Sequence, residues 1–423
     1  MRVLQINAID DILSTGTIMS DIQDVCTHNG IECHIAYPVT IRSKRDILHG
    51  YHIGCWFDHK LHALLSRIFR KQAYFSTIPT WFLLRHINRI RPNVVHLHNL
   101  HSNYINLNML LQYLAKRQIA TIATLHDNWF YTGGCTYYPR LNCTRWLTDC
   151  KGCPQHKHGF VRFLPDTASC ILDDRDRYLN SIPCLTIVGV SDWISDECRK
   201  SRIGRNPIIT IRNGVRNDVF QPMPLEARQQ LRAKYGLRPD QFVILGPASK
   251  WLNHRNRTGL RTMLHSLQPD ELLVLYGCSP QQMADTQITA LSSQLVLLPF
   301  YHNKVELSTI YCMADVMINC TYEDTCSFLN LECQASGTPI ITFDNTGARE
   351  CVDTICSFRT PTGDYQAMYR KVQEIKQQVT PQNPRPFQQA CVSWIEHNFT
   401  MQINYKQYVQ LYKELGQKGT VRL

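Results

Sequence analysis

The sequence predicts an α/β protein made of two doubly wound parallel sheets, and three observations support this. Short apolar runs alternate with segments of helical spacing, which is typical of successive strand–helix–strand units. The runs fall into two series, and 423 residues are enough for two domains. Asn213-Gly214 and a proline-rich stretch at 220–224 separate the series as a turn and a linker. Two such sheets facing each other would form a cleft.

The linker places the predicted domain boundary near residue 220. We expect a first domain at 1–219 and a second at 220–392. Helical spacing at 393–423 predicts a last helix that crosses back to the first domain. Strands are predicted at 3–7, 31–37, 94–98, 121–126, 185–191 and 208–212, and then at 242–246, 272–277, 295–300, 316–320 and 339–343.

Charge and composition narrow the class of partner. Subtracting 34 Asp and Glu from 45 Lys and Arg leaves a net charge of +11, which favours anionic partners such as phosphates or lipid headgroups. No zinc-finger, helix-turn-helix or aromatic ribonucleoprotein pattern indicates nucleic acid. No apolar run reaches the ~20 residues of a membrane span. The first residues read as a strand and not as a signal peptide, so we expect a cytoplasmic location.

Two segments at predicted strand ends can bind phosphates and hydroxyl groups. Gly16 lies in a short loop, Ser14–Thr17, that leads into a helix, and a helix N-terminus attracts phosphate. An ordinary connecting loop explains the same residues. The second segment runs from Tyr322 to Glu332, where two carboxylates, Glu323 and Asp324, precede a helix. Ionised carboxylates accept hydrogen bonds from sugar hydroxyls, although acidic N-capping would give the same pattern.

The second segment belongs to a longer pattern, which resembles glycosyltransferase family 4, the retaining enzymes of the GT-B fold. That family has an acidic residue and a Glu separated by seven residues, then Ala-x-Gly-x-Pro and Gly-x-x-Glu. The matching residues here are Asp324 or Glu323, Glu332, Ala335 with Gly337 and Pro339, and Gly347 with Glu350. The segments 211–215 and 190–193 also match, so the resemblance covers nearly the whole chain.

The resemblance implies a nucleotide-sugar donor bound to the second domain and an acceptor on the side of the first. Glu332 would bind the donor ribose, and Asp324 or Glu323 the donor sugar. The backbone of Phe328 and Leu329 would lie near the phosphates. Catalysis in the family needs no metal, because a basic pair neutralises the leaving diphosphate, as preorganised positive charge can.

That basic pair departs from the family pattern, which is Arg-x4-Lys-Gly. Here Lys250 and Arg255 have the same spacing with the residue types exchanged, and another register places Arg257 before Thr258-Gly259. Arginine binds phosphate as a fork and lysine as a point charge, so the exchange affects function. It keeps open a second interpretation, a catalytically impaired module that binds nucleotide-sugars or other anions.

Histidines end two strands of the first domain. The family has a His near the donor sugar and acceptor at the position of His126, and we favour that role over a strand-end His satisfied by backbone groups. His96 and His98 point to the same side of their strand. Their spacing could ligate a metal, but with no neighbouring carboxylate or Cys we favour structural hydrogen bonds.

The sequence has 18 Cys, most of them in apolar runs where cysteine acts as a small buried hydrophobe. The polar insertion 133–155 differs, because it contains Cys135, Cys143, Cys150 and Cys153. A Cys-x2-Cys pair with two further Cys suits a tetrahedral structural zinc, and free thiols in a loop are the alternative. The insertion resembles the branch of the family that builds bacterial exopolysaccharide, colanic-acid-like capsule and O-antigen.

Acceptors in that branch are commonly lipid-linked, which bears on residues 60–91. This stretch is rich in Leu, Ile, Phe and Trp together with Arg and Lys. A basic amphipathic surface can lie on anionic membrane, and an ordinary helix pair covering the sheet is equally consistent. We therefore expect sugar transfer to a saccharide or lipid-linked oligosaccharide, in the cytoplasm or at the inner face of the plasma membrane.

Overall fold

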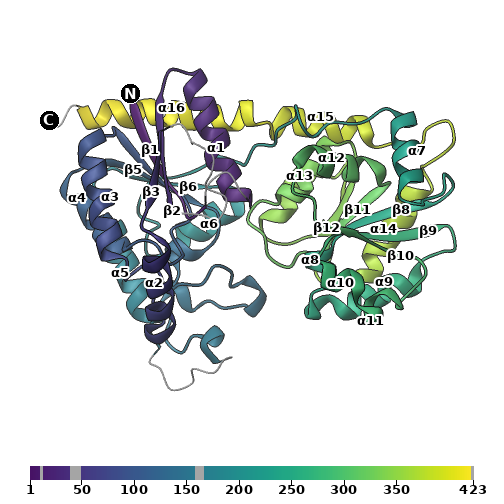
Figure 1. Cartoon of the computed structure of the whole chain (residues 1–423), viewed down its shortest axis with the longest axis horizontal. Helices are drawn as coiled ribbons and strands as arrows, with labels where there is room; N and C mark the ends of the chain where they lie inside the picture. Colours follow the sequence, from purple (N-terminus) through teal and green to yellow (C-terminus); the bar gives the residue numbers. More distant parts are fainter. Residues whose placement is uncertain (10–12, 39–48, 158–165, 421–423) are drawn as a thin grey trace. The chain divides into compact units, whose positions relative to one another are not determined.

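The computed structural model describes residues 1–9, 13–38, 49–157 and 166–420 of the chain. It divides into two compact units, Met1–Asn213 together with Met401–Leu423, and Gly214–Thr400. The division falls at Asn213-Gly214, the turn before the proline-rich stretch. Figure 1 shows the elements of both units.

The first unit contains a seven-stranded sheet in the order β3-β2-β1-β4-β5-β6-β7, with every described pair parallel. The order reverses between β1 and β4, which makes the sheet doubly wound. Its strands are β1 (Arg2–Ile6), β2 (Glu32–Pro38), β3 (Gly50–Ile53), β4 (Val94–Leu97), β5 (Ala120–Leu125), β6 (Leu185–Gly189) and β7 (Ile208–Thr210).

Helices connect these strands, and four short 3-10 turns follow β5. The helices are α1 (Leu13–His28), α2 (Trp56–Phe69), α3 (Thr77–Ile90), α4 (Leu107–Lys116), α5 (Ala168–Leu179), α6 (Asp192–Lys200) and α16 (Met401–Thr420). The 3-10 turns are η1 (Trp129–Tyr131), η2 (Pro139–Leu141), η3 (Arg145–Leu147) and η4 (Pro154–Lys157).

Helix α16 belongs to the first unit although it follows the second in sequence. It packs against α1 (Figure 1) and against β4 and β5. Its buried tyrosines explain the attachment: Tyr412 lies 2.6 Å from His96 Nδ1, and Tyr408 lies 3.2 Å from Thr124 Oγ1. The preceding helix, α15 (Gln388–Asn398), lies in the second unit. The predicted helix at 393–423 is thus two helices, one in each unit.

The second unit repeats the architecture with six parallel strands in the order β10-β9-β8-β11-β12-β13. The order reverses between β8 and β11. The strands are β8 (Phe242–Pro247), β9 (Glu271–Cys278), β10 (Leu295–Pro299), β11 (Val316–Asn319), β12 (Ile340–Phe343) and β13 (Phe358–Thr360).

The remaining elements of this unit are helices α7 (Leu225–Lys234), α8 (Ala248–Trp251), α9 (Arg257–Ser266), α10 (Pro280–Ala284), α11 (Thr286–Thr289), α12 (Lys304–Met313), α13 (Phe328–Ala335) and α14 (Tyr365–Lys376), with 3-10 turns η5 (His254–Asn256) and η6 (Gly347–Cys351). Two arginines of α7 fix it to the sheet, because Arg228 and Arg232 each bind one carboxylate oxygen of buried Asp315, at 2.6 and 2.7 Å.

Candidate functional site

The carboxyl ends of β8 and β11 form the candidate site in the second unit. Ligands bind doubly wound sheets where the strand order reverses, because the loops leave the sheet in opposite directions there. Lys250 follows β8 and Thr321 follows β11, and the lysine Nζ donates to Thr321 Oγ1 at 3.1 Å. Residues 71 positions apart in the sequence thus meet at the reversal point.

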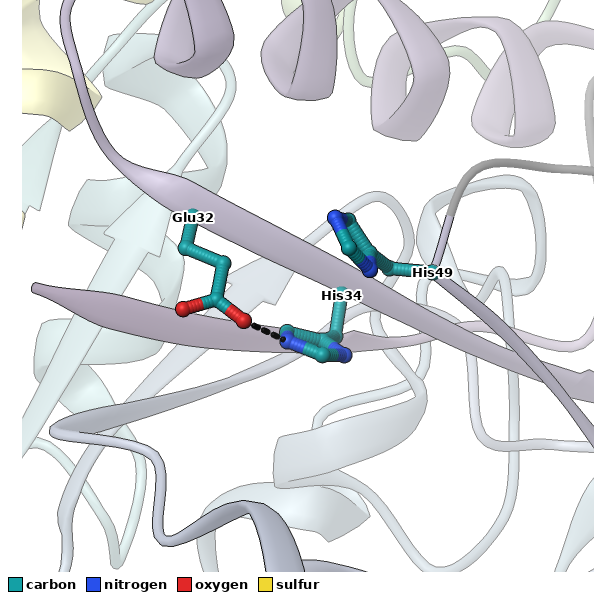
Figure 2. Close-up of side chains that lie close together, drawn as sticks. All are labelled: Glu32, His34 and His49. Atoms are coloured by element: carbon teal, nitrogen blue, oxygen red, sulfur yellow. Dashed lines mark hydrogen bonds and ion pairs between the residues drawn. The ribbon is translucent and has the colours of Figure 1, made fainter.

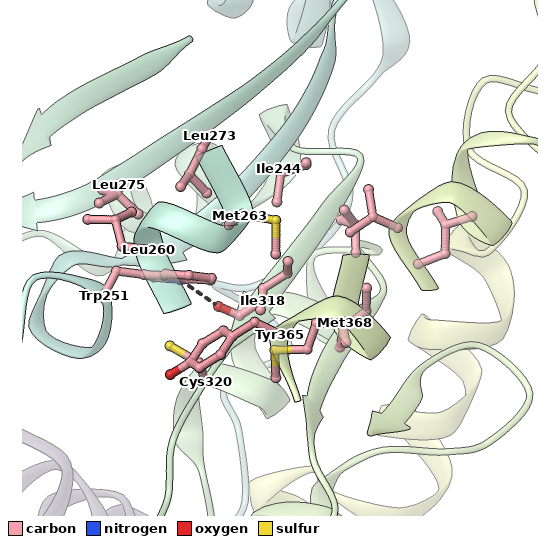
Figure 3. Close-up of a cluster of buried hydrophobic side chains, with 14 of the residues drawn as sticks. Ile244, Trp251, Leu260, Met263, Leu273, Leu275, Ile318, Cys320, Tyr365 and Met368 are labelled. Atoms are coloured by element: carbon pink, nitrogen blue, oxygen red, sulfur yellow. Dashed lines mark hydrogen bonds between the residues drawn. The ribbon is translucent and has the colours of Figure 1, made fainter. Parts of the chain in front are cut away.

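Lys250 is held there by the residue after it. Trp251 is fully buried in the core of the unit, among Leu260, Met263 and Ile318 (Figure 3). Its indole N–H donates to the carbonyl of Ile318 at 3.3 Å. Because α8 has only four residues, this anchor sets the position of the lysine against the end of β11.

Asp324 lies in the loop between β11 and α13. Its backbone N–H donates to Thr346 Oγ1, and its carbonyl accepts from the Gly347 N–H, so the loop is tied to η6. Burial raises the pKa of the Asp324 carboxyl, and the positive charge of Lys250 opposes that rise. The neighbouring Glu323 is half-buried, and its carbonyl accepts from Thr321.

Helix α13 provides the third part of the site. Phe328 and Leu329 are its first two residues, so their N–H groups have no partner within the helix. Glu332 lies one turn further on, where its carboxylate accepts from the buried Tyr311 hydroxyl at 3.1 Å. Burial raises the pKa of Glu332 to about 7, although Lys304 and the Tyr311 hydrogen bond favour the ionised form.

Gly337 terminates this helix. Its φ is +79°, its N–H bonds to the carbonyl of Gln334, and the next N–H, of Thr338, bonds to that of Cys333. This is a Schellman termination, which favours glycine because of the left-handed conformation. The helix therefore has a defined length, which sets Glu332 one turn from its N-terminus.

The two predicted arginines lie beside this group without joining it. Arg255 is on η5 and Arg257 is the first residue of α9, and both side chains are exposed. Asn253 caps η5 by accepting from the Arg255 N–H at 3.1 Å. The structure therefore holds Lys250 in the site and leaves both arginines in solvent.

His126 lies in the first unit, at the end of β5, in a buried chain of hydrogen bonds. Its Nε2 is 2.9 Å from His98 Nδ1, and His98 Nε2 is 2.9 Å from the Gln5 amide oxygen. Burial lowers the pKa of His126 to about 4, although Asp127 opposes the shift. His96 bonds instead to Thr124 and Tyr412, so the His96 and His98 pair has the structural hydrogen bonds that we favoured.

The environment of Gly16 differs from the prediction. Gly16 was expected in a loop before a helix, but it lies in the first turn of α1, which begins at Leu13. Residues 10–12 of the connection are outside the described residues. The apolar positions Ile18, Met19 and Ile22 pack α1 onto the sheet and extend the helix back to this point.

The four clustered cysteines line one cavity in the first unit. Their sulfur atoms do not form a preformed metal site. Among the described residues, the group whose potential metal-ligand atoms lie within 4.8 Å of one another is Glu32, His34 and His49 (Figure 2). Glu32 there is already paired with Arg2 and His34, each at 2.8 Å, so a cation would compete with an arginine.

Sequence reasoning missed two residues of the site in the second unit, Thr321 and Tyr311. Thr321 ends an apolar run and reads as an ordinary strand-end residue. Tyr311 reads as one more apolar position of α12, and only its hydroxyl, bonded to Glu332, makes it a site residue. Periodicity identifies the buried face of a helix but not which buried hydroxyl meets a carboxylate from another helix.

Comparison with known proteins agrees with this geometry. Residues 252–378 match the family model described as glycosyl transferases group 1. The match contains Arg255, Thr321, Asp324 and Glu332, so the part of the chain that holds these candidate residues is similar to group 1 glycosyl transferases. The resemblance inferred from the motifs is confirmed.

Two curated relatives point the same way. The chain is 25% identical over 195 residues to EpsD of Bacillus subtilis (strain 168), a provisionally assigned glycosyltransferase, covering 45% of this chain and 51% of EpsD. It is 26% identical over 165 residues to WcaC of Escherichia coli (strain K12), provisionally assigned to colanic acid biosynthesis, covering 36% and 40%. The matched stretches thus span about half or less of each relative.

Solved structures extend the likeness to both units. Sucrose-phosphate synthase from Thermosynechococcus elongatus superposes with a TM-score of 0.69 at 14% identity, covering 98% of each chain. WaaG, a glycosyltransferase involved in lipopolysaccharide biosynthesis, gives 0.67 at 11%, covering 97% and 99%. Anabaena HepE in complex with UDP-glucose gives 0.64 at 12%, covering 98% and 100%. The predicted GT-B fold is confirmed.

Among the described helices, none is both long and apolar enough to cross a bilayer.

Proposed function

We propose that this chain is a retaining, metal-independent glycosyltransferase that moves a sugar from a nucleotide-sugar to a saccharide acceptor. The proposal rests on one observation: Lys250, Thr321 and Asp324 lie together at the reversal point of the second sheet. Glu332 lies close by, in the helix that follows, where it accepts from Tyr311. The HepE complex with UDP-glucose supports a nucleotide-sugar donor. WcaC, assigned to colanic acid biosynthesis, and WaaG, involved in lipopolysaccharide biosynthesis, support a role in bacterial surface polysaccharide synthesis. For that role we propose a saccharide or lipid-linked oligosaccharide acceptor.

The proposed chemistry follows from where charge develops. When the bond between sugar and diphosphate breaks, the leaving diphosphate gains negative charge, which the lysine and the N-terminus of α13 would stabilise. Arg255 or Arg257 would add a second positive charge once the donor is bound. The carboxylates of Glu332 and Asp324 would accept hydrogen bonds from ribose and sugar hydroxyls.

On the acceptor side, His126 would contact the sugars as a neutral imidazole, because its lowered pKa keeps it uncharged at pH 7. We propose that the leaving phosphate takes the acceptor proton on the same face of the sugar, which retains the anomeric configuration. In this mechanism no side chain needs to act as a separate general base.

The alternative, an impaired module that binds nucleotide-sugars without transfer, is not favoured. It rested on the exchange of lysine and arginine. Lys250 nevertheless lies at the reversal point in contact with the β11 end, and the family match includes the following helices. A point charge in that position can stabilise a diphosphate even without the fork geometry of arginine.

A thermal-shift screen tests the donor site. Nucleoside diphosphates and nucleotide-sugars would be added to the full chain with and without EDTA. A ligand that binds only the folded state raises the melting temperature. We expect a shift with one nucleotide family that EDTA leaves unchanged. A shift abolished by EDTA would contradict metal independence, and no shift with any nucleotide would contradict the donor site.

The catalytic assignment is tested by Lys250→Ala. Loss of one preorganised positive group at developing charge lowers turnover by about 10²–10³-fold. Lys234→Ala is the matched control, because Lys234 is an exposed lysine at the end of α7 in the same unit. Donor consumption with the native acceptor would be measured for both variants. Equal turnover in Lys250→Ala and the control would remove Lys250 from the site.

We also propose that α2 and α3 contact an anionic membrane surface. These helices expose nine large hydrophobic side chains: Trp56, Phe57, Leu61, Leu64, Ile68, Phe69, Ile78, Trp81 and Phe82. Residues 60–91 contain seven Lys or Arg and no Asp or Glu. Apolar side chains among basic ones suit the interface between acyl chains and anionic headgroups, where the tryptophans would lie at headgroup depth.

Vesicle sedimentation tests this surface. We expect the protein to pellet with phosphatidylglycerol vesicles more than with phosphatidylcholine vesicles, and less at high salt. A double variant, Trp56→Ser with Phe57→Ser, should lower binding several-fold. Ile355→Ser is the control, because Ile355 is 75% exposed in the second unit. Equal pelleting of both variants, or of both vesicle types, would contradict the proposal.

A further inference from the structure

One cavity of the first unit, of about 230 Å³, collects groups that the proposed transfer does not use. Trp129 of η1, the turn that follows His126, forms part of its wall. Its walls include all four clustered cysteines, Cys135, Cys143, Cys150 and Cys153, and the guanidinium of Arg175.

Arg175 is the unusual member of this set. It lies on α5 with 1% of its surface exposed, and none of its three side-chain nitrogens has a hydrogen-bond partner in the described part of the chain. Its guanidinium stacks on the ring of Trp129, 3.8 Å from the centroid. A cation–π contact compensates a buried charge only in part. The carboxylate of Asp174 favours the charged form of Arg175 but makes no hydrogen bond to it. A buried cation without a hydrogen-bonded counter-charge is costly, so the guanidinium is suited to an anionic partner in the cavity.

The cysteines supply a way to form that anion. Cys150 and Cys153 bracket a tight turn in which Cys150 has φ 55° and Gly152 has φ 64°. Both cysteines of this Cys-x2-Cys pair line the cavity. Cys135 and Cys143 come from the segment before η3 and reach the same cavity. Four thiolates around one Zn²⁺ carry a net charge of −2, which an adjacent guanidinium would offset by N–H to sulfur hydrogen bonds.

We propose that this cavity binds a structural zinc ion through Cys135, Cys143, Cys150 and Cys153, with Arg175 as the positioning residue that neutralises the centre. Sulfurs around tetrahedral zinc lie roughly 3.8 Å apart, given Zn–S bonds of about 2.3 Å. The cysteines do not form such a cage in the structure, so their side chains close on the ion as it binds. Each thiol loses its proton to solvent in that step, and no electron is transferred.

The proposed zinc site would affect the neighbouring loop that contains Trp129 and Asp127. Trp129 stacks on Arg175 and its N–H donates to Asp127, whose other carboxylate oxygen is 2.8 Å from His101 Nε2. The centre would therefore fix the loop that begins at His126, without touching a substrate.

The test begins with the wild-type full chain, purified without added metal. We expect about one zinc per chain by mass spectrometry, and cobalt exchanged into the site should give the visible absorption of tetrahedral thiolate coordination. Cys150→Ser and Cys153→Ser should lose the metal. Cys170→Ser should keep it, because Cys170 is an exposed thiol on α5. Folded wild-type protein with well under one zinc, and no cobalt–thiolate spectrum, would overturn the proposal.

Arg175→Gln tests the role of the guanidinium counter-charge separately from that of the cysteine ligands. Outer-shell groups typically change metal affinity by about 10–100-fold, so this variant should release zinc to a competing chelator at that much lower chelator concentration. Arg177→Gln on the exposed face of the same helix should behave as wild type. If zinc is absent and inorganic phosphate stabilises wild type but not Arg175→Gln, the cavity is an anion site and the zinc proposal is wrong. Loss of free thiols as a disulfide, without metal, would also overturn it.

Discussion

At the residue scale, the candidate site combines groups that differ in how readily sequence identifies them. Asp324 and Glu332 can be identified from the motif in which an acidic residue and a glutamate are separated by seven residues. Arg175 could have been noticed, because it takes a place in the apolar stripe of α5 with Ile171, Leu172 and Leu179. Its cavity, however, is lined by segments about 20 to 110 positions earlier, and spacing does not show such contacts.

Glu332 should make stability depend on pH in a particular window. Its pKa is about 7 in the folded protein and about 4.5 when unfolded. The folded state therefore holds a proton that the unfolded state has lost, and the free energy of unfolding falls as pH rises from about 4.5 to about 7. The penalty reaches at most about 3 kcal/mol and persists above that pH.

Glu332→Gln removes this titration. We expect the variant to melt at a higher temperature than wild type above pH 7, with the difference closing towards pH 4.5, while donor-dependent activity is lost. Melting temperatures of both proteins from pH 4 to pH 8 would be compared. Parallel curves would mean that Glu332 ionises normally and that its surroundings in the folded protein do not raise its pKa.

At the element scale, apolar runs predicted eleven of the strands, and each lies within a few residues of its expected position. The two missed strands, β3 and β13, are short and lie at sheet edges. Edge strands bury one side less completely, so Gly50–Ile53 lacks the apolar run that identifies central strands. The α1 start was also misplaced, because Ser14–Thr17 has the composition of a loop and packing makes it helical.

The end of α13 gives a prediction at this scale. In Gly337→Ala a Cβ would lie 2.6 Å from Gln388 Cγ and 3.2 Å from Pro222 Cγ, at a φ of +79°. Gly236→Ala is the matched control, because its φ is +70° and nothing lies within 4 Å. We expect the control to lose about 1 kcal/mol through backbone strain alone, and Gly337→Ala to lose about 1–3 kcal/mol more through overpacking. Chemical denaturation measures both, and equal losses would show that the contact relaxes freely.

At the scale of the whole molecule, the prediction of two doubly wound sheets is confirmed, because two series of alternating runs leave few other architectures. The limits of the units were harder to infer. The chain enters the second unit at Gly214 and leaves it at Thr400, and adjoining residues Val215 and Thr400 form a β-bridge. Sequence shows a turn at Asn213-Gly214 but not that a residue 185 positions later pairs beside it.

Because the chain enters and leaves the second unit at neighbouring residues, we predict that this unit folds alone. A fragment of residues 214–400 keeps its sheet, the Asp315 ion pairs and every candidate donor-site residue of that unit. We expect a cooperative melting transition by circular dichroism, and the same nucleotide preference as the full chain in a thermal-shift assay. A fragment without cooperative unfolding would show that the unit depends on the rest of the chain. Cooperative unfolding without nucleotide binding would count against the donor site alone.

The position of α16 has a further consequence for biosynthesis. A ribosome makes β1 to β7 first, yet the helix that supplies the Tyr412 partner of His96 emerges only after the whole second unit. Until then the buried faces of β4 and β5 lack their cover and can bind other chains. The second unit can fold as it emerges, whereas the first is completed only after synthesis passes Tyr412, so truncated products of this gene carry an unfinished first unit.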